Sequence, residues 1–281
     1  MITDQQTNFV YFSGRLPYRH PGLFKKLKVA LRLKGVPYGL LPHTSDIWCR
    51  DYMPIQAASG RFIQFNYNPR YLQSKQSRRT ITDTAKVCKA IGIKPIVSDI
   101  KLDGGNVVAS RTRVIMTERV LLENPSYSAE KLTKELKRLL KVKEVILIPE
   151  CPCDEFGHAD GMVRFLDEDT IFVNEYSLDI DLKEKLHSVL GKAGLAILPV
   201  PYHPYENDDS LDATGIYINY LRLKKAFLYP VYGLHEDALA RETFSGCFGA
   251  RAVPIDAGKL AKEGGILNCI SWNILKGGNI W

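Results

Sequence analysis

The chain has 281 residues, 45% of them hydrophobic, and carries 38 Lys and Arg residues against 31 Asp and Glu residues. No apolar run reaches the roughly 20 residues that a membrane-spanning helix needs, and the first residues lack the features of a secretory signal. These observations predict a globular cytoplasmic protein of one domain, residues 1–281, with reduced cysteines. The basic clusters lack any groove-reading or base-stacking motif, so no nucleic-acid partner is expected.

One pattern recurs five times along the chain: an amphipathic helix, a short apolar strand, and a loop with polar side chains. Helices are predicted at residues 22–34, 82–91, 129–140, 182–192 and 236–248. Strands are predicted at residues 36–41, 94–97, 144–148, 196–200 and 252–255. Ser128 is the expected N-cap of the third helix, and the glycines that follow four of the helices favour left-handed helix ends: Gly35, Gly92, Gly194 and Gly249.

Paired strands are predicted after the loops of the interior repeats, at residues 107–109 with 114–116 and at 162–165 with 170–173. The repeat is therefore a β-β-α-β unit. Its polar loops carry Asp51, Asp103, Asp160, Asn219 and Cys269, which lie 50 to 59 positions apart in sequence. A unit of this length is typical of a structure copied around an axis, and a ring would bring these loops together.

Cys269 follows a glycine-rich segment and is either a buried packing residue or a nucleophile, because a thiolate is the nucleophilic form of cysteine. His158 and Asp160 are two residues apart, a spacing that places both side chains on one face of a strand. A histidine transfers protons near neutral pH, and a neighbouring carboxylate holds either the imidazole or a cation. The alternative for these two residues is a hydrogen-bonded structural pair.

Asp51 is either a structural partner of Arg50 beside a packed Trp48 or an acceptor for a planar, forked cation. Asp103 precedes two glycines and is either a turn residue or a substrate contact. Asp209 belongs to an acidic stretch, residues 206–212, which is either a solvated loop or a lid that attracts an amine.

Cys151 and Cys153 with His158 could belong to a zinc site, but structural zinc sites need four nitrogen or sulfur ligands and no second pair of such residues follows. No metal is expected.

Taken in order, the five loops resemble the agmatine deiminase and bacterial peptidylarginine deiminase family of the pentein, or guanidino-group-modifying, superfamily. The similarity runs from about Asp46 to Cys269. Its motifs are Asp-x-Trp-x-Arg-Asp-x-x-Pro ending at Pro54, an acidic-Gly-Gly-Asn segment at residues 103–106, Gly-His-x-Asp at 157–160, Tyr-x-Asn at 217–219, and the glycine-rich nucleophile loop at 264–269.

The resemblance implies an α/β fold, a five-bladed α/β propeller of β-β-α-β repeats with pseudo-fivefold symmetry. It also implies that Asp51 and Asp160 hold a guanidinium over Cys269, that His158 transfers protons, and that a thiouronium intermediate is hydrolysed to a ureido product without a cofactor. Trp48, Asp103, Asn219 and Asp209 are the expected substrate-binding residues.

The sequence departs from the family at Met53, Asn268 and residues 271–273, and Asp103 is shorter than the usual Glu, so the wall of the pocket is expected to differ. The leading substrate is agmatine, which would place the protein in polyamine biosynthesis. The alternatives are a peptidylarginine deiminase, an amidinotransferase and a non-catalytic guanidine-binding propeller. Besides the small guanidine substrate, the partner considered is a second copy in a homodimer.

Overall fold

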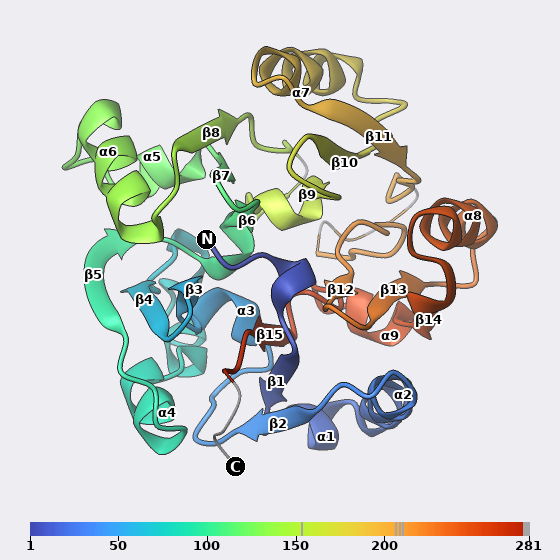
Figure 1. Cartoon of the computed structure of the whole chain (residues 1–281), viewed down its shortest axis with the longest axis horizontal. Helices are drawn as coiled ribbons and strands as arrows, with labels where there is room; N and C mark the ends of the chain where they lie inside the picture. Colours follow the sequence, from blue (N-terminus) through green and yellow to red (C-terminus); the bar gives the residue numbers. More distant parts are fainter. Residues whose placement is uncertain (153, 206, 208, 210, 278–281) are drawn as a thin grey trace.

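The computed structural model describes residues 1–152, 154–205, 207, 209 and 211–277. Within this part of the chain the strands form five three-stranded sheets that lie around a common centre, each with a helix on its outer side (Figure 1). No sheet among these residues joins the next, so the five remain separate rather than forming one closed sheet.

Each sheet has the same plan. A central strand pairs antiparallel with one neighbour and parallel with the strand that follows the outer helix. In chain order the first two complete units are β3 (Ile55–Ala58), β4 (Arg61–Asn66), α4 (Thr84–Ala90) and β5 (Ile96–Lys101), then β6 (Val108–Ala109), β7 (Arg113–Thr117), α6 (Ala129–Leu140) and β8 (Glu144–Ile148). The next two are β9 (Val163–Phe165), β10 (Thr170–Asn174), α7 (Ile180–Lys192) and β11 (Ala196–Val200), then β12 (Leu221–Arg222), β13 (Phe227–Val231), α8 (Glu236–Phe248) and β14 (Ala252–Asp256).

The remaining sheet is assembled from both ends of the described chain. Its central strand β1 (Phe9–Ser13) pairs antiparallel with β15 (Ser271–Ile274) and parallel with β2 (Tyr38–Leu41), which follows α2 (Pro21–Leu33). Tyr11 lies opposite Trp272 in this register. The pairing fixes the segment after Cys269 to the start of the chain.

Shorter helical segments connect these units and carry several of the polar loops. The α-helical ones are α1 (Leu16–Arg19), α3 (Cys49–Tyr52), α5 (Arg119–Glu123) and α9 (Gly258–Ala261). The 3-10 segments are η1 (Asp4–Gln6), η2 (Arg70–Leu72), η3 (Ser77–Thr80), η4 (Gly104–Asn106), η5 (Ala159–Gly161) and η6 (Gly249–Arg251).

The predicted β-β-α-β repeat is confirmed, since each predicted helix and strand overlaps an observed one. Ser128 caps α6 by accepting a hydrogen bond from the backbone N–H of Lys131, at 3.3 Å. The glycines expected at helix ends, Gly35, Gly92, Gly194 and Gly249, all have a positive φ. Local sequence pattern therefore determines these boundaries.

The core lies between the sheets and the outer helices. Strand β1 is buried along its whole length, and α6 buries Leu132, Leu136, Leu139 and Leu140 on one face. Burial of each such leucine contributes about 1.5–3 kcal/mol, which holds the helix against its sheet. None of the described helices has the length and apolar character that crossing a bilayer requires.

Candidate active site

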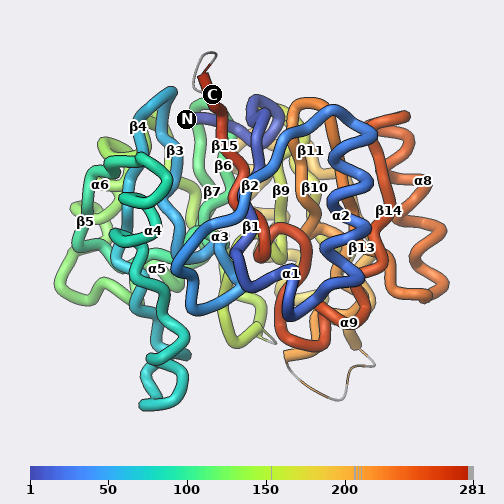
Figure 2. The backbone as a smooth tube through the Cα atoms, turned by 90° about the horizontal axis from the view of Figure 1, so that it is seen from below, coloured from blue at the N-terminus to red at the C-terminus, as the bar shows by residue number. Residues whose placement is uncertain are grey.

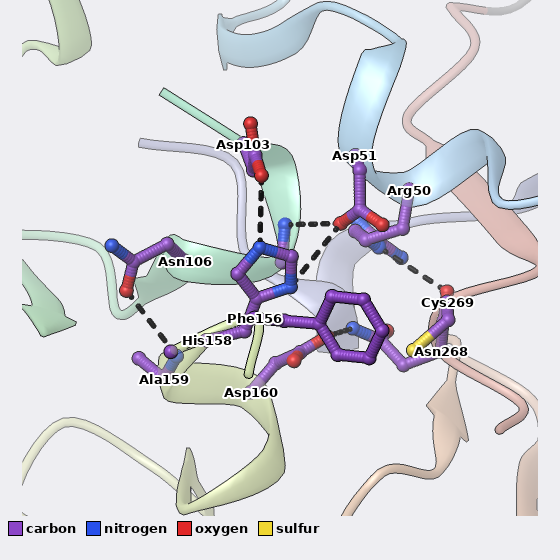
Figure 3. A network of polar contacts seen from close by, with 12 residues as sticks. Arg50, Asp51, Asp103, Asn106, Phe156, His158, Ala159, Asp160, Asn268 and Cys269 are labelled. Atoms are coloured by element: carbon purple, nitrogen blue, oxygen red, sulfur yellow. Dashed lines mark hydrogen bonds and ion pairs between the residues drawn. The ribbon is translucent and has the colours of Figure 1, made fainter. Parts of the chain in front are cut away.

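One cleft collects side chains from loops that are far apart in the sequence. It has a volume of about 480 Å³, within the range typical of small-molecule sites. Of the residues predicted from sequence, the following line it: Trp48, Asp51, His158, Asp160, Asp209, Asn219 and Cys269. Figure 3 shows Asp51, His158, Asp160 and Cys269 converging from different segments.

Cys269 lies half-buried between α9 and β15. Its Sγ lies 3.4 Å from the side-chain oxygen of Asn219, to which the thiol donates. Burial raises the pKa of the Cys269 thiol well above its ordinary value, and the nearby carboxylates of Asp160 and Asp51 raise it further. The free protein therefore holds a neutral thiol, and a bound cation would favour the thiolate.

His158 lies in the predicted loop, as the residue before the 3-10 segment η5, so the strand geometry considered for His158 and Asp160 does not apply. Its backbone N–H donates to Asp154 Oδ2 at 3.0 Å, which stabilises the turn. The ring lies between two carboxylates, with Nε2 at 3.0 Å from Asp103 Oδ2 and Nδ1 at 3.7 Å from Asp51 Oδ1. Burial opposes the charged ring, but Asp51, Asp103 and Asp160 outweigh it and raise the pKa of His158 to about 10.

Asp51 is in the short helix α3 and its side chain is buried. Burial raises the pKa of Asp51 to about 7, with Asp103 and Asp160 adding to the effect and His158 opposing it. The backbone N–H of Gly105 donates to Asp51 Oδ1 at 3.0 Å. A Cβ at position 105 would lie 2.6 Å from His158 Nδ1 and 2.7 Å from Asp51 Oδ1. Only glycine therefore lets the backbone approach both side chains.

Asp103 lies behind the imidazole and is absent from the residues that line the cleft. Its Oδ2 contacts His158 and also accepts a hydrogen bond from the hydroxyl of Tyr71, at 2.7 Å. Asn106 of the same motif accepts from the backbone N–H groups of Thr117 and Ala159, at 2.8 and 3.2 Å. This motif thus ties η5, and with it His158 and Asp160, to strand β7.

Asp160 is buried and accepts a hydrogen bond on Oδ2 from the side-chain amide of Asn268, at 2.5 Å. Asn268 directly precedes Cys269, and its backbone N–H donates to Asn219 Oδ1 at 3.1 Å. The nucleophile loop, Asn219 and Asp160 therefore form one hydrogen-bonded unit, so Asn219 contacts the loop as well as the cleft.

Trp48 and Asp209 lie at different parts of the cleft. The Trp48 ring packs over Gly265, where a Cβ would come within 2.4 Å of the indole, so only glycine is tolerated beneath it. Asp209 is exposed, and its side chain accepts from the backbone N–H of Leu211 at 2.9 Å. Its neighbours Glu206, Asp208 and Ser210 lie outside the described residues.

The charge of the cleft is strongly one-sided. Among the described residues that line it, eight are acidic and none is Lys or Arg, although the protein as a whole carries a formal charge of +7. The acidic residues are Asp46, Asp51, Asp154, Asp160, Asp179, Asp209, Asp212 and Glu263. Such a lining attracts cations and repels carboxylates.

Within the described part of the chain, no group of three or more His, Cys, Asp and Glu side chains is arranged to hold a metal ion. Cys153, a candidate zinc ligand in the sequence, lies outside that part.

Sequence reasoning missed Tyr71 and Asp154 and assigned no role to Asn106 or Asn268. Tyr71 lies in η2, a segment that carries no motif, so no local signal marks it. Asn268 appeared only as a departure from the family pattern. Its hydrogen bond to Asp160 joins positions 108 residues apart. Such a contact is defined by the tertiary fold and has no signature along the chain.

Solved structures share this fold. Agmatine deiminase from C. jejuni matches with a TM-score of 0.79 at 20% identity, over 98% of this chain and 96% of that one. Agmatine deiminase of Enterococcus faecalis matches with a TM-score of 0.74 at 18% identity, over 96% of this chain and 94% of that one. DDAH from Pseudomonas aeruginosa matches with a TM-score of 0.61 at 11% identity, over 96% of this chain and 100% of that one. The fold is the pentein fold. No curated protein sequence matches the chain.

The fold and the family match together define an enzyme class, the hydrolases that act on C–N bonds of guanidine groups. Within that class, the chain belongs to the Porphyromonas-type peptidyl-arginine deiminase family, whose model matches residues 33–274. The resemblance based on the five motifs is thereby confirmed.

Proposed function

We propose that the protein is a deiminase for a small guanidine with a cationic tail, with agmatine as the leading candidate. The observation that carries this proposal is the cleft lining, in which a thiol, an imidazole and two buried carboxylates lie among further acids without any Lys or Arg in the described part. The α-carboxylate of free arginine would find no Lys or Arg among the described residues that line the cleft, whereas an ammonium group would be attracted by the acids.

In the proposed reaction, Asp51 and Asp160 accept hydrogen bonds from the guanidinium and hold its carbon near the Cys269 sulfur. The substrate cation lowers the cost of ionising the buried thiol, which releases its proton to solvent, and the thiolate adds to the guanidinium carbon. Protonated His158 gives its proton to the departing nitrogen, which leaves as ammonia. The carbon remains bound to sulfur as a thiouronium. Orientation and charge-matched hydrogen bonds supply most of the rate.

Hydrolysis then completes the cycle. His158, now neutral, accepts a proton from water as the oxygen adds to the thiouronium carbon. The C–S bond then breaks to return the thiolate, and the ureido product loses its remaining proton to solvent. The product is a ureido compound, and one ammonia is released for each water consumed. Asp103 contacts His158 and not the cleft, so we assign it to orienting the ring and keeping it charged.

The proposal extends to the architecture. We propose that the five sheets are the blades of one α/β propeller with pseudo-fivefold symmetry, and that residues 1–281 form a single catalytic domain. The shared strand order of the sheets supports this. Their arrangement around a centre does so as well (Figure 1).

A direct test incubates the purified protein with agmatine, free arginine and an arginyl peptide, and measures ammonia and ureido product. Turnover of agmatine alone supports the proposal. Turnover of the peptide alone would instead indicate a peptidylarginine deiminase. Transfer of the amidino group to an added amine would instead indicate an amidinotransferase. No product from any of the three would indicate a non-catalytic binder.

The matched control is Cys247→Ala. Cys247 is a partly exposed thiol on α8 that does not line the cleft. This variant should keep wild-type turnover, whereas Cys269→Ala should lose it.

A further inference from the structure

Residues 2–8, here called the axial segment, lie at the centre of the five sheets (Figure 1). The N-terminus lies at the end of the molecule opposite α9 (Figure 2). The segment contacts four sheets. Its partners are Gln56 of β3, Arg164 of β9, Arg222 of β12 and Ile274 of β15. A segment joined to so many separate sheets holds their relative positions.

Asp4 of this segment pairs with a buried cation. Its Oδ2 lies 2.5 Å from Arg164, whose side chain is almost fully buried over the ring of Tyr220. Its Oδ1 accepts from the side-chain amide of Asn273 at 3.0 Å. Burial opposes ionisation of Asp4, but Arg164 and Arg50 outweigh it and lower the pKa of this carboxyl. Without Asp4, the guanidinium of Arg164 would lose the carboxylate with which it forms an ion pair.

The hydrogen bonds continue from Asn273 to the candidate active site. The side-chain oxygen of Asn273 accepts from Arg50, and Arg50 Nε donates to the carbonyl of Asn268 at 3.4 Å. The backbone N–H of Arg50 donates to the carbonyl of Cys269 at 3.0 Å (Figure 3). Asn268 in turn holds Asp160. The path therefore ends on both the nucleophile and a guanidinium-binding carboxylate.

Several side chains of this path border an unfilled space inside the protein. A cavity of about 60 Å³ separates the axial segment from the nucleophile loop, and the polar side chains that border it include Asp4, Arg50, Asp160, Arg164, Asn268 and Asn273. Polar groups around such a space are held by their mutual hydrogen bonds, so removal of one member is felt by the others.

We propose that Asp4 is a positioning residue, which acts through Asn273, Arg50 and Asn268 to hold Cys269 and Asp160 in register with the substrate. The inference rests on the proposed deiminase function. A displacement of about 1 Å at a reacting centre costs about a hundredfold in rate, so a residue far from the cleft has a measurable effect on turnover.

The test compares Asp4→Asn with Gln5→Ala. Gln5 accepts from the side chain of Arg222 at 2.8 Å in the same segment, and within the described residues its side chain has no hydrogen bond to Asn273, Arg50 or Asn268. We expect Asp4→Asn to lower kcat/KM by about ten- to a hundredfold and Gln5→Ala by less than about threefold, with both variants assayed at a temperature at which each remains folded. Asp4→Glu, which keeps the charge, should retain more activity than Asp4→Asn. Asn has nearly the same shape as Asp, so Asp4→Asn tests the positioning role of Asp4 even if a larger change such as Asp4→Ala prevents folding.

Two further measurements separate positioning from general destabilisation. In a double-mutant cycle, the effects of Asp4→Asn and Asn273→Ala on kcat/KM should be less than additive, because both interrupt one path. The rate at which iodoacetamide alkylates Cys269, followed by peptide mass spectrometry, should change in Asp4→Asn and not in Gln5→Ala.

Additive effects, or an Asp4→Asn variant that matches Gln5→Ala in both kcat/KM and alkylation rate, would overturn the inference. Wild-type protein that turns over no guanidine would overturn the proposed function instead. The alkylation comparison would then still decide the role of Asp4.

Discussion

Nδ1 of His158 lies 3.7 Å from Oδ1 of Asp51, and both groups retain their protons to a higher pH than they do in water. The pKa of His158 is raised to about 10 and that of Asp51 to about 7. Slightly above neutral pH the site thus combines a charged imidazole with an ionised carboxylate. The proposed mechanism needs this combination, because the carboxylate holds the guanidinium while the imidazolium supplies the proton for ammonia.

The pH dependence of kcat/KM should be bell-shaped. The rising limb, near pH 7, reports ionisation of Asp51, and the falling limb, near pH 10, reports loss of the proton of His158. Initial rates with agmatine across pH 5–11 measure both. A profile that stays flat from pH 6 to pH 11 would disagree with these assignments.

Asp103→Asn should move the falling limb to lower pH. The variant keeps the shape of the side chain but removes a negative charge 3.0 Å from His158, and that charge helps to raise the pKa of the ring. Tyr71→Phe is the control, because it removes a hydrogen bond to the same oxygen and leaves the charge in place. If the falling limb of Asp103→Asn stays at the wild-type pH, the charge of Asp103 does not raise the pKa of His158.

Asp51 should make the folded protein less stable as the pH rises. The carboxyl holds its proton to about pH 7 when folded but only to about pH 3.9 when unfolded, so the folded state binds more protons between these values. The contribution of Asp51 to the free energy of unfolding is therefore present at low pH and is lost as the pH rises to about 7.

Urea unfolding at pH 5 and pH 7 tests this. The fall in the free energy of unfolding between the two should be smaller in Asp51→Asn than in the wild type. His158 acts in the same direction at higher pH, since its stabilising charge is lost as the pH rises through about 10. A larger fall in the free energy of unfolding in Asp51→Asn than in the wild type would contradict the predicted direction of the Asp51 effect.

Gly105→Ala should strongly reduce activity. The added methyl group would overlap both the imidazole of His158 and the carboxylate of Asp51. We expect a loss in kcat/KM of about a hundredfold and a destabilisation of about 1–3 kcal/mol. Gly191→Ala in α7 is the matched control, because nothing lies within 4 Å of its new methyl group and the variant should be fully active. Equal activity in the two variants would show that the close approach at Gly105 is unimportant.

Much of the fold follows from local sequence. The helix of residues 129–140 is marked by its leucine spacing and by Ser128, and it begins and ends as predicted because those signals are local. The conformation of His158 does not follow in this way. The two-residue spacing of His158 and Asp160 would place both side chains on one face of a strand, but Asn106 and Asp154 hold the segment in a 3-10 turn through long-range and local hydrogen bonds.

The candidate site could be predicted in part for the same reason. Asp51, His158, Asp160 and Cys269 belong to motifs, so their convergence could be expected from the repeat. Tyr71 supports the site from a segment without a motif. The pKa values of Asp51 and His158 depend on distances between three loops, which only the folded chain defines.

The most direct test of the account is to trap the intermediate. The protein is mixed with agmatine, quenched in acid within the first turnover, and analysed by intact-mass and peptide mass spectrometry. We expect a thiouronium adduct on Cys269 that is absent from Cys269→Ala, and we expect His158→Ala to be unable to release product. Full turnover by Cys269→Ala, or an adduct on any other residue, would contradict it.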